Sequence, residues 1–154
     1  MINFRVQNQT QNKTSMKYLF SFIVTAFFCL SVSAADITVT FTNLRSPSGT
    51  LIIGIYDKAS AFPKEGKQIK KVSIPVNKKS LTTTLTLPEG EYAFAICHDE
   101  DNNGTCNQNF LGIPQEGFAF SNNFRPKLKA PAFNDVKFKV GKEDMKLNIK
   151  LIYF

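Results

Sequence analysis

The feature that most constrains the fold is an alternation of apolar and polar residues, which recurs along most of the chain beyond residue 35. Near its start, Ile37, Val39 and Phe41 alternate with threonines. A period of two residues is typical of a β-strand with one buried face, and helical periodicity is scarce. The alternation predicts seven strands, at residues 36–42, 50–56, 69–76, 80–87, 91–98, 136–140 and 146–153.

Residues 99–134 do not fit a strand, and they are rich in Gly, Pro, Asn and Phe. A segment of this length inside a domain is usually functional or disordered, and its phenylalanines argue against disorder. We therefore expect one long ordered loop. Short strands with frequent turns favour two antiparallel sheets that bury one face each. The expected fold class is an all-β antiparallel β-sandwich of about seven strands with this long loop.

The first 35 residues are expected to lie outside the sandwich. Residues 16–35 combine a lysine, a short apolar run and small residues at Ala34 and Ala35, which is the pattern of a signal peptide. The apolar run is too short for a comfortable membrane span, so we expect none after cleavage. The polar residues 1–15 are interpreted as a gene-start artefact or an unusually long leader. Residues 36–154 form a single domain, periplasmic or secreted.

The charge of the exported part is mild. The full chain carries +7, but three of its 19 basic residues precede residue 36, so residues 36–154 hold 16 basic and 12 acidic residues, a net +4. Many lysines alternate with apolar residues, as in residues 137–140 and 146–151, which indicates the solvated face of strands. The export signal and the lack of a recognisable nucleic-acid-binding motif exclude a nucleic-acid partner.

Two cysteines, Cys97 and Cys106, remain in the exported part. Exported proteins meet oxidising conditions, which permit a disulfide between them. Closing so short a loop would stabilise the fold by roughly 2–3 kcal/mol through chain entropy. The alternative is a buried free thiol at Cys97 and an unrelated exposed thiol at Cys106.

The stretch between these cysteines predicts a candidate metal site. Its oxygen-bearing residues stand at alternate positions, as in the first half of an EF-hand calcium loop, with Gly104 where the chain must turn sharply. The candidate ligands are Asp99, Asp101, Asn103, Thr105 (through its carbonyl) and Asn107.

The second half of the calcium pattern fails, because Phe110 stands where a bidentate glutamate is needed. Glu116, further along the long loop, is the candidate replacement. With so few carboxylates we expect weak calcium binding, in the ~10⁻⁴–10⁻³ M range of extracellular modules. The alternatives are a loop closed by Asx turns without an ion, and a transition-metal site. Zinc would need more imidazole or thiolate than is present.

Five further residues are candidates for ligand binding. His98, the only histidine, is interpreted as a titrating group or ligand beside the acidic loop, or as a strand-end side chain hydrogen-bonded to backbone. Phe118, Phe120, Phe124 and Arg125 are candidates to face a ligand from the long loop. The alternative for the phenylalanines is that they plug the open edge of the sandwich.

Three functions are compatible with these features. The first is a non-catalytic binding or accessory module of the cell envelope that recognises an envelope glycan or protein. The second is a structural envelope protein with a disulfide-stapled loop and no ion. A more distant third is a glycoside hydrolase that uses two carboxylates among Asp99, Asp101 and Glu116. We expect no enzyme, because no Ser/His/Asp order and no multi-histidine site is present in the sequence.

A set of short motifs also resembles a known family. In chain order these are Ile55-Tyr56-Asp57, Phe62-Pro63, Leu87-Pro88-Glu89-Gly90-Glu91-Tyr92, His98-Asp99-Glu100, Asn103-Gly104, Phe110-Leu111-Gly112-Ile113-Pro114, Glu116-Gly117, Phe120-Ser121-Asn122-Asn123 and Pro131-Ala132-Phe133. They resemble the bacterial exported family called domain of unknown function 2141, over nearly all of residues 36–154.

The resemblance implies a small exported domain with no assigned activity and an immunoglobulin-like or prealbumin-like sandwich. The turn at residues 87–92 is similar to turns of prealbumin-like and collagen-adhesin-repeat sandwiches. The chain departs from the family where Cys106 and Asn107 replace an apolar residue and an aspartate. That loss of a carboxylate weakens the calcium prediction, and the gained cysteine suggests a covalent staple in its place.

Overall fold

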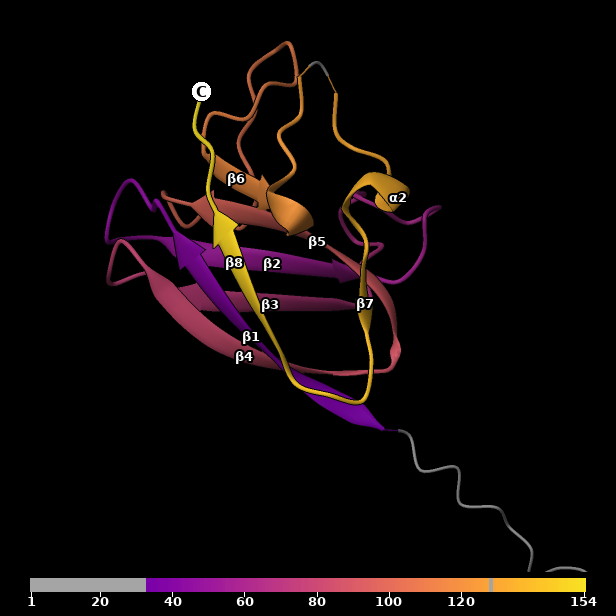
Figure 1. Ribbon diagram of the computed structural model, residues 1–154. Coiled ribbons are helices and arrows are strands. Elements are labelled where there is room, and N and C mark those ends of the chain that lie inside the picture. The colour runs from indigo at the N-terminus through magenta and orange to yellow at the C-terminus, as the bar shows by residue number, and fades with distance from the viewer. Residues whose placement is uncertain (1–32, 128) are drawn as a thin grey trace, which may run out of the picture. The chain divides into compact units, whose positions relative to one another are not determined.

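The structure is a computed structural model, and it describes residues 33–127 and 129–154. The predicted leader and nearly all of the predicted signal peptide therefore lie outside the described residues. Ala34 and Ala35, expected to precede the sandwich, are instead the first residues of its first strand. Figure 1 shows two β-sheets with a few short helical turns beside them. The elements are β1 (Ala34–Thr42), β2 (Thr50–Tyr56), β3 (Lys70–Pro75), β4 (Leu81–Pro88), β5 (Gly90–Asp99), β6 (Gly117–Phe120), η1 (Ser121–Asn123), α2 (Phe133–Val136), β7 (Phe138–Val140) and β8 (Met145–Lys150).

The smaller sheet has three strands in the order β4-β1-β8. β1 and β4 are antiparallel, with Ile37 opposite Leu85, whereas β1 and β8 are parallel, with Ile37 opposite Met145. A parallel neighbour needs a long connection, and here the whole of the chain between β1 and β8 supplies it. The sandwich is therefore antiparallel in all its strand pairings except this one.

The larger sheet has five strands, with β3-β2-β5-β6 in order and β7 paired with the first residues of β5. All its pairings are antiparallel. Beyond β8 the chain leaves the small sheet, and Ile152 exchanges two backbone hydrogen bonds with Phe118 of β6 at 2.9 and 2.8 Å. The C-terminal segment thus ties the two sheets together at one edge.

The main core lies between the two sheets and is built from alternate residues of each strand, as a period of two requires. Its largest fully buried members include Phe41 of β1, Ile53 and Ile55 of β2, Phe94 of β5 and Ile149 of β8. The opposite face of β2 and β5 is also covered, at one end, by a second apolar cluster. That cluster contains Tyr56, Phe62, Ala93, Phe133 and Val136.

The prediction of an all-β sandwich is confirmed, and six of the seven predicted strands agree with the observed bounds to within two residues; the last strand ends three residues earlier than predicted. The long segment 99–134 is ordered but is not all loop, because it contains β6 and η1. The predicted strand 136–140 is shorter than expected, since Val136 ends the helical turn α2 and only 138–140 form β7. Among the described residues no helix is long and apolar enough to cross a membrane.

Candidate functional site

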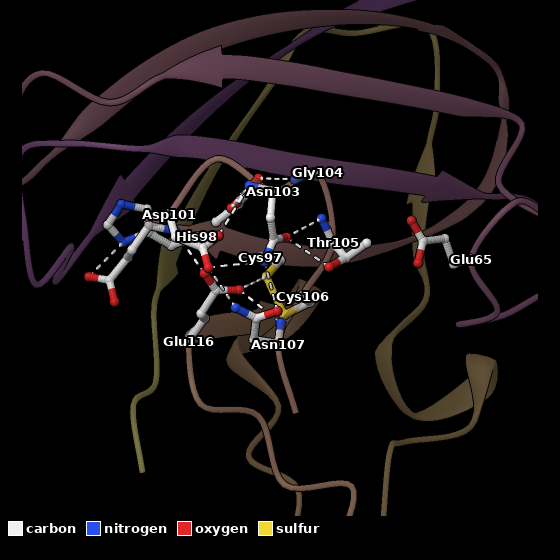
Figure 2. Close-up of a disulfide and its surroundings, with 12 residues drawn as sticks. Glu65, Cys97, His98, Asp101, Asn103, Gly104, Thr105, Cys106, Asn107 and Glu116 are labelled. Atoms are coloured by element: carbon white, nitrogen blue, oxygen red, sulfur yellow. Dashed lines mark hydrogen bonds and ion pairs between the residues drawn. A yellow bond between two sulfur atoms is a disulfide. The ribbon is translucent and has the colours of Figure 1, made fainter. Parts of the chain in front are cut away.

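The acidic loop after β5 is closed by its own hydrogen bonds (Figure 2). Asp99 ends β5 and is 2% exposed. Its Oδ1 accepts the Asn103 N–H at 3.1 Å and its Oδ2 accepts the Gly104 N–H at 2.8 Å. This is an extended Asx turn, in which a side chain near the strand end satisfies backbone donors that the strand can no longer reach. Gly104 permits the turn with φ near +84°.

The exposed part of the loop is a polar ring. Asp101 Oδ2 accepts the amide N–H groups of Asn103 and Asn107 at 3.0 and 2.9 Å, and Asn103 Oδ1 accepts the N–H of Thr105 at 2.9 Å. Desolvation acts to raise the pKa of Asp101, but the hydrogen bonds from Asn103 and Asn107 outweigh it and lower that pKa below its ordinary value. Asp101 is therefore ionised at neutral pH.

Glu116 enters the loop from the residue before β6, as the sequence predicted, and is 5% exposed. Its Oε1 accepts the Glu100 N–H at 2.9 Å and its Oε2 accepts the Asn107 N–H at 2.9 Å. Carboxylate oxygens of Asp99, Asp101 and Glu116 lie within 4.8 Å of one another. In the described part of the chain none of these three carboxylates has a basic side chain within ion-pair distance.

The predicted disulfide is present between Cys97 of β5 and Cys106 of the acidic loop, with Cα atoms 5.9 Å apart. Cys97 Sγ also lies 3.8 Å from Glu116 Oε2, which is a contact and not a hydrogen bond because the bridged sulfur carries no proton. Two independent ties, one covalent and one through Glu116, therefore hold the acidic loop against the large sheet.

His98 is fully buried at the opposite face of β5 from the disulfide. Its Nε2 donates to the Ser48 carbonyl at 2.8 Å, and its Nδ1 lies 2.9 Å from the Tyr153 hydroxyl. Burial raises the pKa of that hydroxyl, so Tyr153 stays protonated and donates to Nδ1. Both ring nitrogens are thus occupied. The structure gives His98 the strand-end role of the second interpretation and leaves it no free atom for a ligand.

The side chain of Glu100 points away from the acidic cluster and toward the turn at residues 45–49. It accepts hydrogen bonds from the Arg45 guanidinium and, at 3.1 Å, from the Ser46 hydroxyl. The hydrogen bond from Arg45 is the largest cause that lowers the pKa of Glu100. The Arg45 guanidinium also lies 4.7 Å from the centre of the Tyr153 ring. This carboxylate serves the fold and is not part of the metal-ligand set.

A cleft of about 480 Å³ opens on the outer face of the large sheet, next to the acidic loop. Its floor includes two small residues, Gly54 of β2 and Ala95 of β5, which lie opposite each other in the strand register. One wall is the disulfide-tied segment 104–106, and a second is the loop that carries Leu111 and Ile113. The volume falls within the range of small-molecule binding sites.

The predicted aromatic residues separate into two groups. Phe118 and Phe120 of β6 line the cleft, and their ring centroids lie 6.1 Å apart. Phe120 and Phe124 both pack on the second apolar cluster, but Phe124 does not line the cleft, and Arg125 is exposed beside a depression with Lys150. The structure therefore brings two of the four residues to a common site. The phenylalanines both close the sheet edge and shape a hollow, so the two interpretations of the sequence do not exclude each other.

Several residues of the cleft were missed in the sequence. Gly54 and Ala95 have no functional groups that mark them in the sequence. Only the register of β2 and β5 shows that they lie next to each other. Leu111 and Ile113 could have been identified from the sequence. Together with Phe110 they make three apolar residues within four positions of an otherwise polar loop, which is unusual. Leu111 is 67% exposed and Ile113 is 40% exposed, which marks them as surface apolar residues that a ligand could cover.

The fold and the site together define a small β-sandwich with a disulfide-tied acidic loop and an apolar cleft. The profile of a family described as "Uncharacterized protein conserved in bacteria (DUF2141)" matches residues 39–148, which is more than half of the chain. The chain belongs to this bacterial family, and the resemblance noted from its motifs is confirmed. No curated protein and no solved structure matches the chain.

Proposed function

We propose that this protein is an exported, non-catalytic binding module of the bacterial cell envelope, and that its ligand is held in the cleft on the outer face of the large sheet. The observation that carries the proposal is the cleft itself, a hollow of about 480 Å³ with Phe118 and Phe120 in its wall. Aromatic and aliphatic walls with few polar groups are typical of ligand sites. The disulfide and the signal-peptide pattern of residues 16–35 support an oxidising compartment.

The two other functions proposed from sequence receive less support. A glycoside hydrolase needs two carboxylates that face the sugar from opposite sides. Asp99 and Glu116 are buried and accept backbone N–H groups, and neither lines the cleft. A purely structural role would use a sheet edge, yet the edge strand β3 carries Lys70 and Lys71, which discourage pairing with another strand.

The proposal is tested by a substitution on the floor of the cleft that fills part of its volume. Ala95→Leu places a larger side chain on the floor, between β2 and β6, without enlarging the core between the sheets. Ala59→Leu, in an exposed turn away from the cleft, is the matched control. We expect the neutral fluorescent probe N-phenyl-1-naphthylamine to bind the native protein and the control saturably, and the Ala95→Leu protein at least ten-fold more weakly.

Circular dichroism and the melting temperature establish that both variants are folded. Equal probe binding by all three proteins, or none by the native protein, would contradict the proposal, since in either case the cleft would not be the binding site.

A second proposal is that calcium orders the acidic loop. It rests on one observation, the convergence of the Asp99, Asp101 and Glu116 carboxylates without a basic partner among the described residues. Like charges so close together repel, and a divalent cation would relieve that repulsion. The hydrogen bonds that already close the loop would remain, because each carboxylate oxygen has more than one lone pair.

The calcium proposal is tested by thermal unfolding. With a dissociation constant of about 1 mM, 10 mM calcium would stabilise the protein by about 1.4 kcal/mol, and a chelator should reverse the shift. Asp101→Asn should abolish the shift, whereas Asp57→Asn, an exposed aspartate outside the loop, should keep it. An unchanged melting temperature in calcium would leave the loop as a hydrogen-bonded and disulfide-tied turn.

A further inference from the structure

We infer that the cleft binds a single-chain anionic amphiphile, a fatty carboxylate whose head lies at the lysine end and whose chain lies along the sheet. The inference rests on the proposed function and adds the chemical class of the ligand. It is carried by the order of side chains across the large sheet, by the charges at the mouth of the cleft and by one unpartnered polar atom in its lining.

The first step is the row of residues that crosses the floor of the cleft. Lys71 of β3 lies opposite Gly54 of β2, Gly54 lies opposite Ala95 of β5, and Ala95 lies opposite Phe120 of β6. Residues opposite each other in a sheet share one face. The row therefore runs from a lysine, past Gly54, against which the Tyr56 ring lies, and the small Ala95, to an aromatic ring. That order matches a molecule with one charged and one apolar end.

The second step is the length of this row. Neighbouring strands lie about 4.8 Å apart, so three spacings from β3 to β6 span about 14 Å. A C–C bond length near 1.5 Å gives an extended alkyl chain about 1.3 Å per carbon. A chain of about ten to twelve carbons would therefore reach across the sheet from β3, which carries Lys71, to β6, which carries Phe120.

The third step is the charge at the mouth. Three lysines line the cleft, Lys71, Lys127 and Lys129, against one carboxylate, Glu65. Glu65 lies 3.6 Å from the Lys71 ammonium, which also donates to the Gly104 carbonyl at 3.4 Å. Within the described ranges Lys127 and Lys129 form no ion pair. The mouth thus keeps an excess of positive charge that a carboxylate head would neutralise.

The fourth step is the apolar surface held open around the cleft. Phe110 and Leu111 are 94% and 67% exposed on a turn that Asn109 fixes, since its Oδ1 accepts the N–H groups of Leu111 and Ile113 at 2.9 and 3.0 Å. Phe154, 71% exposed, lines the cleft with Leu111, and its ring centroid lies 5.4 Å from that of Phe118. Exposed apolar side chains on an ordered turn mark a contact surface for an apolar partner.

A polar atom in the lining is also without a partner. Gln68 lines the cleft, and its Oε1 is buried with no hydrogen bond to any described residue. A buried acceptor left unpaired costs free energy, so a donor is expected to reach it. If the Gln68 amide turns toward the cleft on binding, a 3-hydroxy group on the chain would supply that donor, and the inference therefore extends to 3-hydroxydodecanoate as a tighter ligand than dodecanoate.

The experiment is displacement of N-phenyl-1-naphthylamine from the purified protein by twelve-carbon compounds at concentrations below micelle formation. The compounds are dodecanoate, 3-hydroxydodecanoate, dodecan-1-ol and dodecyltrimethylammonium. We expect dodecanoate to bind about ten-fold more tightly than the alcohol, because a charge-assisted hydrogen bond is worth more than a neutral one. The ammonium compound should bind most weakly, and added salt should narrow the differences.

Lys71→Met keeps the aliphatic stem and removes the charge, and the double variant Lys127→Met/Lys129→Met does the same at the other side of the mouth. We expect these variants to bind dodecan-1-ol as the native protein does but to lose most of the preference for dodecanoate. Lys146→Met, on β8 of the small sheet, is the matched control and should keep that preference.

The outcomes separate this inference from the proposed function. Equal affinity for the alcohol and the carboxylate, or tighter binding of the ammonium compound, would overturn the inference and leave the cleft a binding site. Binding only to phosphatidylglycerol vesicles, with no displacement by monomeric dodecanoate, would also overturn it. Failure of the probe itself to bind would instead remove the proposed function.

Discussion

The contribution of the Cys97–Cys106 disulfide can be worked out from its place in the chain. It closes a loop with a sequence separation of 9 residues. In the loop-closure relation such a loop removes about 9 cal/mol/K of entropy from the unfolded chain, or about 2.6 kcal/mol at 25 °C. For a domain of this size, in which unfolding gains about 0.25 kcal/mol/K, that corresponds to a fall of about 10 °C in melting temperature.

The assay is urea unfolding followed by circular dichroism, with and without a phosphine reductant. Reduction of the native protein should cost somewhat less than 2.6 kcal/mol, because the freed Cys97 thiol is already 3.8 Å from Glu116 Oε2 and can donate to it. The variant Cys97→Ala/Cys106→Ala lacks that donor, so it should lose the full amount. Its free energy of unfolding should be the same with and without the reductant, so it also serves as the control for the reductant.

A loss below about 1 kcal/mol in the double variant would refute this reasoning. It would mean that the hydrogen bonds of Glu116 and Asp99 hold the acidic loop closed even in the unfolded ensemble, so that the disulfide removes little chain entropy.

Three further predictions concern the hydrogen bonds around this loop. Glu116→Gln should destabilise the fold by about 1–3 kcal/mol in urea unfolding, because an amide nitrogen cannot accept the backbone N–H that the lost oxygen accepted. Tyr153→Phe should cost about 1–3 kcal/mol, since it leaves His98 Nδ1 and the Arg45 N–H without partners. Arg45→Met should remove the stabilisation that comes from the lowered pKa of Glu100. That stabilisation is present above the ordinary pKa of 4.5 and is lost as the pH falls through the lower folded pKa, so native and variant stabilities should converge in acid.

Each of these variants has a matched control in the chain. Glu89→Gln changes an exposed carboxylate, Tyr92→Phe removes a hydroxyl without a hydrogen bond to the described residues, and Arg125→Met removes an exposed guanidinium. All three should change the stability by less than about 0.5 kcal/mol. A native-like Glu116→Gln protein, or an Arg45→Met protein that still loses stability in acid as the native does, would contradict the assigned contacts.

The strands that the sequence predicted well are those with one buried and one open face, such as β1, where buried and more exposed residues alternate. β6 was missed because Gly117, Phe118 and Ala119 are all buried, so a four-residue strand shows no alternation. The parallel pairing of β1 and β8 could not be predicted from local sequence patterns, since the paired residues are more than a hundred positions apart. A pattern within one strand cannot reveal which distant strand lies beside it.

The acidic loop was predictable because its chemistry lies in consecutive residues. The disulfide was favoured by residue type and spacing and is present. Glu116 was only a candidate on a distant part of the long loop, and its place beside the acidic loop comes from the pairing of β6 with β5. The cleft was not predictable in the same way. Its lining residues come from strands and loops far apart in the sequence, and small residues such as Gly54 and Ala95 are brought together only by the strand register.

The small residues at positions 54 and 95 also offer a way to compare members of the family by whether they have the hollow. The hollow depends on two small residues on the outer face of the sheet, whereas the sandwich core depends on the residues between them, such as Ile53, Ile55, Phe94 and Ile96. A relative with a bulky side chain at position 95 would keep the core and fill the hollow, whereas a side chain at position 54 would also have to displace the Tyr56 ring. If the proposed binding holds, the residue at position 95 separates relatives that have the hollow from relatives that share only the architecture.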